Sequence, residues 1–336
     1  MRTVGGGRNL RAMMTVAELK QAPRGEKTPF EAVLLIRRLA MKKARNESEF
    51  LMVELGDRTG MFHVVCFGNS ANFGFFQELG EGRVVRVQGN TDYYQGRFSP
   101  SLVRVEAVPE SDVPGVLEQL VETAPMPLDD LRKELEEHVG AIQHDALRAT
   151  VRNALEETGP DFHTSPAAVS MHHAYRGGLL EHTVRMARAA RALLPLYPEV
   201  APDLALAGII LHDIGKCPEY TQGLATARSR AGILQGHVVL GYRQVRRSAI
   251  QSKLDPDLAE RLEHIILSHQ GELEWGAATK AATPEAVFVS MVDNLDAKLG
   301  MVQYFLRATP DGEAFSEHVP GLGAPLLVNP PENLSS

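Results

Sequence analysis

Cysteine is scarce in this chain: among its 336 residues only Cys66 and Cys217 occur. Neither belongs to a Cys-x-x-Cys pair, and the two fall in segments that read as different domains. The sequence therefore argues against a disulfide framework and against a zinc site built from thiolates. Any bound metal ion must be held by histidine and carboxylate side chains.

Segments that could cross a membrane are also lacking. No stretch is long and apolar enough to span a bilayer, and the Gly- and Arg-rich start MRTVGGGRNLRAMM has no apolar core of the kind that a signal peptide needs. With 44% hydrophobic and 23% charged residues, the composition is that of an ordinary globular protein. We expect a cytoplasmic protein with no membrane partner, and the length of 336 residues predicts two domains.

Positive charge is unevenly distributed. The net charge is −7, but residues 1–110 carry 16 Lys and Arg against 12 Asp and Glu, whereas residues 111–336 carry 19 against 30. A mildly basic front module on an acidic remainder suits binding of a polyanion by the front module. An acidic body is also common in globular proteins, so this asymmetry alone decides little.

Residues 28–108 have the texture of short strands, rich in β-branched and aromatic residues and separated by Gly, Asp and Asn turn signals. Three strands, a helical interval at 69–82 and two further strands predict a five-stranded barrel. This order resembles an OB-fold, which binds oligonucleotides on the face of its second and third strands. We place the domain at residues 15–110, after a flexible N-terminus at 1–14. The strand segments read FEAVLLIRRL, EFLMVELGD, GMFHVVCFG, RVVRVQGNTDYY and GRFSPSLVRVEAV.

A basic run, RRLAMKKAR at residues 37–45, falls in the predicted loop between the first two strands. We expect its five cationic side chains to contact nucleic-acid phosphates; the alternative is an ordinary solvated loop. These side chains are Arg37, Arg38, Lys42, Lys43 and Arg45. Aromatic residues of the barrel can stack on bases, although most belong to the core and only one or two should face a ligand. The candidates are Phe62, Phe67, Tyr93, Tyr94 and Phe98.

From about residue 128 to 309 the apolar residues recur at i, i+3 and i+4 spacing, which predicts an all-α bundle. Residues 111–127, with prolines around a short helix, form the predicted linker. The Pro- and Gly-rich tail at 310–336 is expected to be irregular. The predicted fold class is therefore multi-domain α+β, with a five-stranded OB-like barrel followed by an all-α bundle.

Ionisable residues interrupt the apolar faces of this bundle. A lone histidine is more often a core or surface residue, and a lone aspartate can simply cap or pair. Six such groups on five helices together predict a metal centre, because imidazole and carboxylate are ligands of Mn, Fe and Zn and bundles build such sites from facing helices. The six are His182, His212, Asp213, His237, His269 and Asp293.

The same residues carry a resemblance to the HD-domain metal-dependent phosphohydrolases, whose pattern is a histidine, a His-Asp doublet and a distant aspartate. The longer matching stretches are HHAYRGGLLEHTVRM, ILHDIGK, GHVVLGY, HIILSHQGELEWG and PEAVFVSMVDNLDAK. With the OB-like module in front, the chain resembles the YhaM type of 3′→5′ exoribonuclease over roughly residues 15–306. The resemblance implies an all-α HD domain at residues 128–309.

The resemblance also implies a ligand set. One divalent ion, expected to be Mn²⁺ with Mg²⁺, Fe²⁺, Co²⁺ or Zn²⁺ as alternatives, is held by His182, His212, Asp213 and Asp293. A second ion, bridged by Asp213, is held by His237 and His269. His264 is a poorer candidate because five residues from His269 put it on a different helix face. Gln270 departs from the family, which commonly reads His-His-Gly where this chain reads HQG.

The substrate contacts are less well defined than the ligands. Lys216, three residues after Asp213, is expected to act with it on the phosphate; the alternative is a cation that stabilises a helix end. Cys217 reads as a packing residue and not as a nucleophile. The remaining candidates for contact with substrate in this module are His172, His173, Arg176, Asn294 and Lys298.

These features predict a metal-dependent 3′→5′ exoribonuclease that hydrolyses single-stranded RNA to nucleoside 5′-monophosphates. Single-stranded DNA is an additional candidate substrate. A divalent ion would make water a nucleophile at neutral pH and neutralise charge on the phosphate. The alternatives are an HD-type nucleotide or cyclic-dinucleotide phosphohydrolase and a non-catalytic nucleic-acid-binding protein. The sequence leaves the oligomeric state open, a homo-oligomer included.

Overall fold

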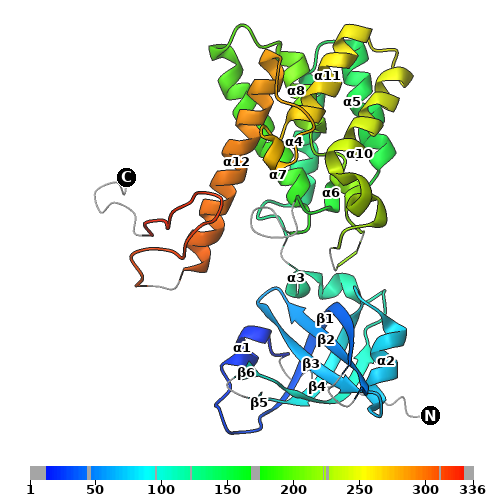
Figure 1. Cartoon of the computed structure of the whole chain (residues 1–336), viewed down its shortest axis with the longest axis vertical. Coiled ribbons are helices and arrows are strands. Elements are labelled where there is room, and N and C mark those ends of the chain that lie inside the picture. Colours follow the sequence, from blue (N-terminus) through cyan, green and yellow to red (C-terminus); the bar gives the residue numbers. More distant parts are fainter. Residues whose placement is uncertain are drawn as a thin grey trace, which may run out of the picture. The chain divides into compact units, whose positions relative to one another are not determined.

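The computed structural model describes residues 13–43, 47–94, 97–121, 123–167, 175–221, 223–224, 227–309 and 312–328. The chain divides into two compact units (Figure 1). One runs from Met1 to Glu122 and includes Gly223–Thr226; the other comprises Thr123–Gln222 and Ala227–Ser336. Among the described residues, no helix is both long and apolar enough to cross a membrane.

The first unit is built on a five-stranded antiparallel sheet in the order β3-β2-β1-β4-β7, with β3 and β7 at its ends. The helix α2 (Ala71–Leu79) lies between β3 and β4 in the chain, so the predicted five-stranded OB-like domain with a helical interval is confirmed. The strands are β1 (Pro29–Lys43), β2 (Glu49–Asp57), β3 (Gly60–Phe67), β4 (Val84–Asn90) and β7 (Ser101–Ala107). Smaller elements are α1 (Val16–Lys20), β5 (Tyr93–Tyr94), β6 (Arg97–Phe98), the 3-10 turn η1 (Val113–Gly115) and α3 (Leu117–Leu120).

The long strand β1 pairs with two neighbouring strands, one after the other. Its residues 29–35 pair with β4, and its residues 35–43 pair with β2. The register shifts between Ile36 and Arg38, which is the mark of a bulge and bends the strand from one partner toward the other. Beyond this bulge β1 pairs with β2 up to the pair Lys43 and Glu49, and β2 pairs with β3 on its other side. We call this part of β1, residues 38–43, the arm.

The basic run was predicted to lie in a loop, and for Arg37–Lys43 this is wrong, because these residues belong to β1. Opposite charges face each other between the arm and β2, Arg38 with Glu54 and Lys43 with Glu49, and such pairs favour the extended form. The side chain of Arg37 is also committed, since its Nη2 donates to the backbone oxygen of Asp57 at 2.6 Å. Arg45 lies outside the described residues.

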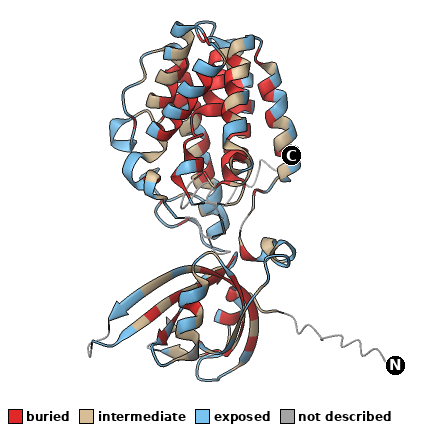
Figure 2. Cartoon of the chain, turned by 90° about the vertical axis from the view of Figure 1, so that its right-hand side faces the viewer, coloured by how far each residue is buried: buried red, intermediate tan, exposed pale blue. Residues whose placement is uncertain are grey.

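The second unit is the predicted helical bundle (Figures 1 and 2). Its centre is α8, in which every residue from Leu204 to Leu211 is buried and which packs against α4, α5, α7, α11 and α12. The long helices are α4 (Leu128–Ala141), α5 (Asp145–Thr158), α7 (Gly178–Leu193), α8 (Pro202–Leu211), α10 (Arg230–Gln251), α11 (Pro256–Ser268) and α12 (Pro284–Ala308). Short elements are α6 (Asp161–Thr164), η2 (Leu194–Leu196), α9 (Lys216–Glu219) and η3 (Leu273–Trp275).

Two glycines shape the chain around His237: Gly215 permits a close approach to α10, and Gly236 permits a break within that helix. A Cβ added to Gly215 would lie 2.0 Å from the backbone oxygen of His237 and 2.5 Å from the backbone nitrogen of Gly241, so only glycine permits this approach. Within α10, Gly236 has φ 70° and ψ 160°, a left-handed break that glycine tolerates. The break directly precedes His237 and separates the orientation of that side chain from the first turns of the helix.

Candidate functional site

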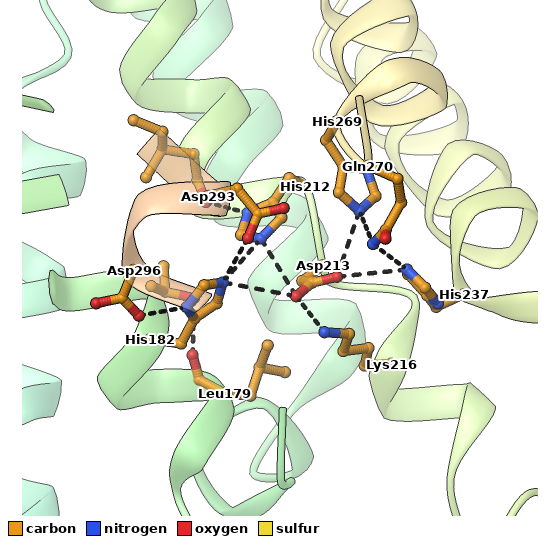
Figure 3. Close-up of polar contacts among 12 residues, drawn as sticks. Leu179, His182, His212, Asp213, Lys216, His237, His269, Gln270, Asp293 and Asp296 are labelled. Atoms are coloured by element: carbon orange, nitrogen blue, oxygen red, sulfur yellow. Dashed lines mark hydrogen bonds and ion pairs between the residues drawn. The ribbon is translucent and has the colours of Figure 1, made fainter. Parts of the chain in front are cut away.

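The structure brings all six predicted ligands into one cluster (Figure 3). His182 comes from α7 and Asp293 from α12, His212 and Asp213 directly follow α8, and the remaining two histidines come from α10 and α11. The side chains of His182, His212, Asp213 and His269 are at most 3% exposed. Asp293 and His237 are 16% and 19% exposed, so they mark the side of the cluster that solvent reaches.

Asp213 stands between two groups of ligands. On one side its Oδ2 lies 3.2 Å from Nε2 of His212 and 3.8 Å from Nε2 of His182, which is itself 3.3 Å from Oδ1 of Asp293. We call these four residues the first site. On the other side Oδ1 of Asp213 lies 3.6 Å from Nε2 of His237 and 3.5 Å from Nε2 of His269, the second site.

Backbone carbonyl groups fix the tautomers of two histidines. Nδ1 of His212 donates to the oxygen of Ile209 at 2.8 Å, and Nδ1 of His269 donates to the oxygen of Ile266 at 2.7 Å. Each histidine bonds to the carbonyl three residues before it, at the end of its helix. In the neutral ring the proton is therefore on Nδ1, and the Nε2 lone pair points into the cluster.

Carboxylates fix the tautomers of the other two histidines. Nδ1 of His182 donates to Oδ2 of Asp296 at 2.8 Å, and Nδ1 of His237 faces Oε2 of Glu219 at 3.2 Å. Carboxylates behind ligating histidines orient the ring and raise its basicity in metal sites. Neither Asp296 nor Glu219 was predicted from the sequence. Asp296 follows Asp293 by three residues, on the same helix face, and this spacing is the signal that could have found it.

One carboxylate oxygen of the cluster has no hydrogen-bond donor. Oδ1 of Asp213 is buried and accepts no hydrogen bond among the described residues. A buried acceptor without a donor is costly, and a cation bound beside this oxygen would satisfy it. The donor set of imidazole nitrogen and carboxylate oxygen fits a divalent transition metal.

The charges of the cluster point the same way. Burial alone would lower the pKa of His182, but hydrogen bonds to Asp293 and Asp296 raise it to about 9. Burial would raise the pKa of Asp293, yet its hydrogen bond to His182 and the neighbouring histidines lower it to about 2. His182 is therefore protonated at neutral pH, and the carboxylates around it favour a positive charge at the position of its Nε2.

Lys216 directs its ammonium group at the same carboxylate. Its Nζ lies 2.5 Å from Oδ2 of Asp213, and the side chain is largely buried. Burial would raise the pKa of Asp213, but Lys216 and His212 outweigh it and hold that pKa well below the usual range. The charge of Lys216 therefore stabilises the carboxylate of Asp213 in the cluster and does not stabilise a helix end.

The other predicted residues of this unit are less directly placed. His172 and His173 lie outside the described residues. The backbone of Arg176 pairs with Thr123, and no contact between its side chain and the cluster is seen in the described part of the chain. Asn294 and Lys298 are half-buried on α12 beyond Asp293. A role of these five residues in substrate binding stays a prediction.

Two negative expectations have structural counterparts. Nε2 of His264 accepts a hydrogen bond from the backbone N–H of Ala282 at 2.8 Å, so this histidine supports a loop outside the cluster. Cys217 belongs to the buried core, and burial raises the pKa of its thiol to about 12. A thiol with this pKa is not a nucleophile at neutral pH.

In the first unit, the five aromatic candidates separate into core and surface. Phe62 is buried and packs edge-to-face with Phe98. The hydroxyl of Tyr93 donates to the backbone oxygen of Lys20 at 2.8 Å. Phe67 and Tyr94 are exposed, 53% and 69% respectively, and agree with the expectation that one or two would face a ligand.

Phe67 belongs to an exposed apolar surface on β2 and β3 that the sequence analysis did not assemble. Phe50, directly opposite on β2, has its ring centroid 6.0 Å from that of Phe67, and Met52 lies opposite Val65 in the next row. Lys42 of β1 pairs with Phe50 on the other side. This surface, defined by Lys42, Phe50, Met52, Val65 and Phe67, places a cation beside two neighbouring aromatic rings, inclined to each other by 51°. It lies on the β2–β3 face, through which OB-folds bind single strands.

Comparison with known proteins supports both units. Residues 33–109 match the family of OB-fold nucleic acid binding domains, and residues 179–298 match the HD domain. Three curated relatives are described as 3'-5' exoribonuclease YhaM. That of Shouchella clausii is 32% identical, covering 87% of this chain and 90% of its own. The Listeria innocua protein is 32% identical (89% and 95%), and the Bacillus pumilus protein is 30% identical (83% and 88%).

Proposed function

This chain belongs to the YhaM family of 3'-5' exoribonucleases, and we propose that it degrades single-stranded RNA from the 3′ end with the aid of divalent metal. The products are nucleoside 5′-monophosphates, and single-stranded DNA is a second substrate. The observation that carries the proposal is the convergence of four imidazole Nε2 atoms and two carboxylates on one largely buried point. We further propose a cytoplasmic location, where such RNA is found.

The residues of the cluster have distinct tasks in this proposal. The first site, His182, His212, Asp213 and Asp293, holds one ion, and the second site, Asp213, His237 and His269, holds another; Mn²⁺ suits these donors. When bound, the metal makes water nucleophilic at neutral pH and neutralises charge on the scissile phosphate. Asp213 carries one carboxylate oxygen toward each site, so a single side chain sets their spacing.

Lys216 is the residue of the cluster that is free to change partner. Its ammonium lies against Oδ2 of Asp213 in the metal-free protein, where it neutralises that carboxylate. With a metal ion held by Asp213, Lys216 would no longer be needed to neutralise this carboxylate and would be able to donate to a phosphate oxygen. Asp293 and His237, the more exposed ligands, would lie nearest to the entering phosphate.

In this proposal the first unit binds the single-stranded RNA. Phe50 and Phe67 offer rings on which bases stack, and stacking is tolerant of sequence because every base has a π-face. Arg38, Lys42 and Lys43, exposed on the arm of β1, attract the phosphates. Arg37 is less available than these three, because its Nη2 already donates to the backbone oxygen of Asp57.

The test is a time course with 5′-labelled single-stranded RNA in the presence of Mn²⁺, Mg²⁺ or EDTA. We expect a stepwise ladder with Mn²⁺, none with EDTA, and slower reaction when the 3′ end carries a phosphate. The matched variants are Asp213→Asn, expected to be inactive, and Asp257→Asn, an exposed aspartate paired with Arg261, expected to be fully active.

Three results would contradict the proposal. Cleavage of circular RNA would show an endonuclease. Turnover of mononucleotides or cyclic dinucleotides alone would show the phosphohydrolase alternative. Binding of RNA without any hydrolysis in Mn²⁺ would show a non-catalytic binding protein.

A further inference from the structure

Gln270 lies across the second site (Figure 3). Its Nε2 is 3.1 Å from Nε2 of His269 and 3.2 Å from Nε2 of His237. These are the same two imidazole atoms that lie 3.5 and 3.6 Å from Oδ1 of Asp213. The amide of Gln270 therefore forms hydrogen bonds with both nitrogen ligands of the second site. The carboxylate oxygen of that site, Oδ1 of Asp213, has no hydrogen bond among the described residues.

The orientation of the amide follows from the tautomers. Nδ1 of His269 donates to a backbone carbonyl, and Nδ1 of His237 faces the carboxylate of Glu219, so both Nε2 atoms are acceptors. An amide NH₂ has two N–H donors and can serve both acceptors, whereas the amide oxygen would be repelled by both. The side chain of Gln270 thus provides what a cation would otherwise provide to these two rings.

The two sites differ in what competes with an ion. The first site has two carboxylates, Asp213 and Asp293, whereas the second has only the other oxygen of Asp213. Only at the second site does an uncharged protein donor cover both imidazoles, within the described residues. An ion entering the second site must first break both hydrogen bonds of Gln270.

We propose that Gln270 occludes the second metal site, so that this chain binds its two ions with unequal affinity and fills the second only when metal is abundant. The proposal rests on the metal centre assigned above. Its consequence is regulatory: availability of divalent metal, and not only of RNA, sets how many molecules have both sites filled. Gln270 acts on the metal through His237 and His269 and is a positioning residue, since it contacts neither substrate nor ion in this state.

The experiment titrates metal-stripped full-length protein with Mn²⁺ and follows free Mn²⁺ by electron paramagnetic resonance. For the wild type we expect one tight equivalent and a second at least about tenfold weaker, because two net hydrogen bonds are lost on its entry. Gln270→Ala removes both donors and should tighten the second site about tenfold. Gln270→Glu, which also adds a carboxylate, should tighten it further.

Gln235→Ala is the matched control. Gln235 lies two residues before His237, but its side chain is exposed and accepts a hydrogen bond from Arg243, so its loss should leave both affinities unchanged. Two equal sites in the wild type, or a second site that Gln270→Ala and Gln270→Glu leave unchanged, would overturn the role of Gln270. So would a weaker second site in Gln270→Ala, which would make the amide a ligand.

The titration also separates this proposal from the proposed function. A wild type that binds no Mn²⁺ would overturn the metal centre and the role of Gln270 together. Unequal Mn²⁺ sites that Gln270→Ala makes more equal, in a protein that does not degrade RNA, would support the role of Gln270 and overturn only the ribonuclease activity.

Discussion

His182 binds Asp296 through Nδ1, and Asp296 is held in turn by Nε of Arg185 at 2.8 Å. This chain of contacts fixes the ring before any metal arrives. Neither Asp296 nor Arg185 is a candidate ligand, so their effect on metal can be tested without removing one.

We predict that Asp296→Ala lowers the affinity of the first site for Mn²⁺ by about 10- to 100-fold, the usual cost of losing such an outer partner. The fold should persist, because the buried side chain of Asp296 contributes polar contacts to His182 and Arg185 and belongs to no apolar core cluster. The measurement is the same titration of metal-stripped protein, with Asp257→Ala as a control of equal charge change on an exposed helix face. Equal affinities in Asp296→Ala and wild type would remove Asp296 from the site.

A pH dependence follows from His182. In the metal-free protein its pKa is raised to about 9, so Nε2 carries a proton at neutral pH, and a metal ion can bind only by displacing it. We predict release of about one proton per first ion at pH 7.5, and an affinity that rises about tenfold per pH unit until it levels near pH 9. Calorimetry in two buffers of different ionisation enthalpy measures the released proton. A pH-independent affinity between 7 and 9 would contradict the prediction.

At the scale of elements, sequence and structure agree where one pattern dominates. The apolar periodicity of 128–309 gave the helices, and the wholly apolar stretch before His212 became the buried helix α8 that carries the doublet to the centre of the bundle. The predicted ligands meet because their helices pack on this one. Imidazole and aspartate inside apolar runs therefore indicated which side chains converge in the bundle.

The agreement failed where partners distant in sequence decide the outcome. The basic run looked like a loop, since cationic residues are common in loops, but pairing with Glu49 and Glu54 of β2 extends β1 through it. Glu219 and Gln270 reach the cluster only through the close approach of α9, α10 and α11. The stretch HQG drew attention to Gln270, but its contact with His237, like that of Glu219, depends on tertiary packing.

The arm of β1 yields a prediction of its own. Replacing Arg38, Lys42 and Lys43 by glutamine should weaken binding of single-stranded RNA and lower the slope of log affinity against log salt by up to about 2, since each lost contact to a single strand contributes about 0.7. The rate at saturating RNA should change little. Binding measured at several salt concentrations, by fluorescence anisotropy, provides the slope.

A control with the same charge change separates this effect from net charge. Arg246, Arg247 and Arg261 are paired with acidic side chains on the helical unit, and their replacement by glutamine should leave the slope almost unchanged. If both triple variants lower the slope equally, the arm has no special role and the charge of the whole molecule accounts for binding.

At the scale of the whole molecule, two units of different chemistry share one chain. The β2–β3 surface with Phe50 and Phe67 suits unpaired bases, because a ring can stack only on a base that is not already stacked within a duplex. The metal cluster is largely buried, and Asp293 and His237 are its most exposed ligands, so it suits a chain end better than the middle of a strand. Both features suit a substrate with an unpaired end, and the 3'-5' direction of the family makes this the 3′ end.

The structure of the substrate should therefore decide where degradation stops. We predict that a blunt RNA duplex resists the enzyme, and that a duplex with a 3′ overhang is shortened only until a few unpaired nucleotides remain, since one OB-fold engages about 4–16 nucleotides. A series of overhangs from 2 to 20 nucleotides on a labelled strand measures this limit. The double variant Phe50→Ala, Phe67→Ala should lose affinity for long overhangs, because each lost stack costs about 1–3 kcal/mol, while Val103→Ala, an exposed apolar residue of β7, should not. If blunt and overhanging duplexes disappear at the same rate, the enzyme does not select RNA by its unpaired bases. The first unit then has a role other than binding unpaired RNA.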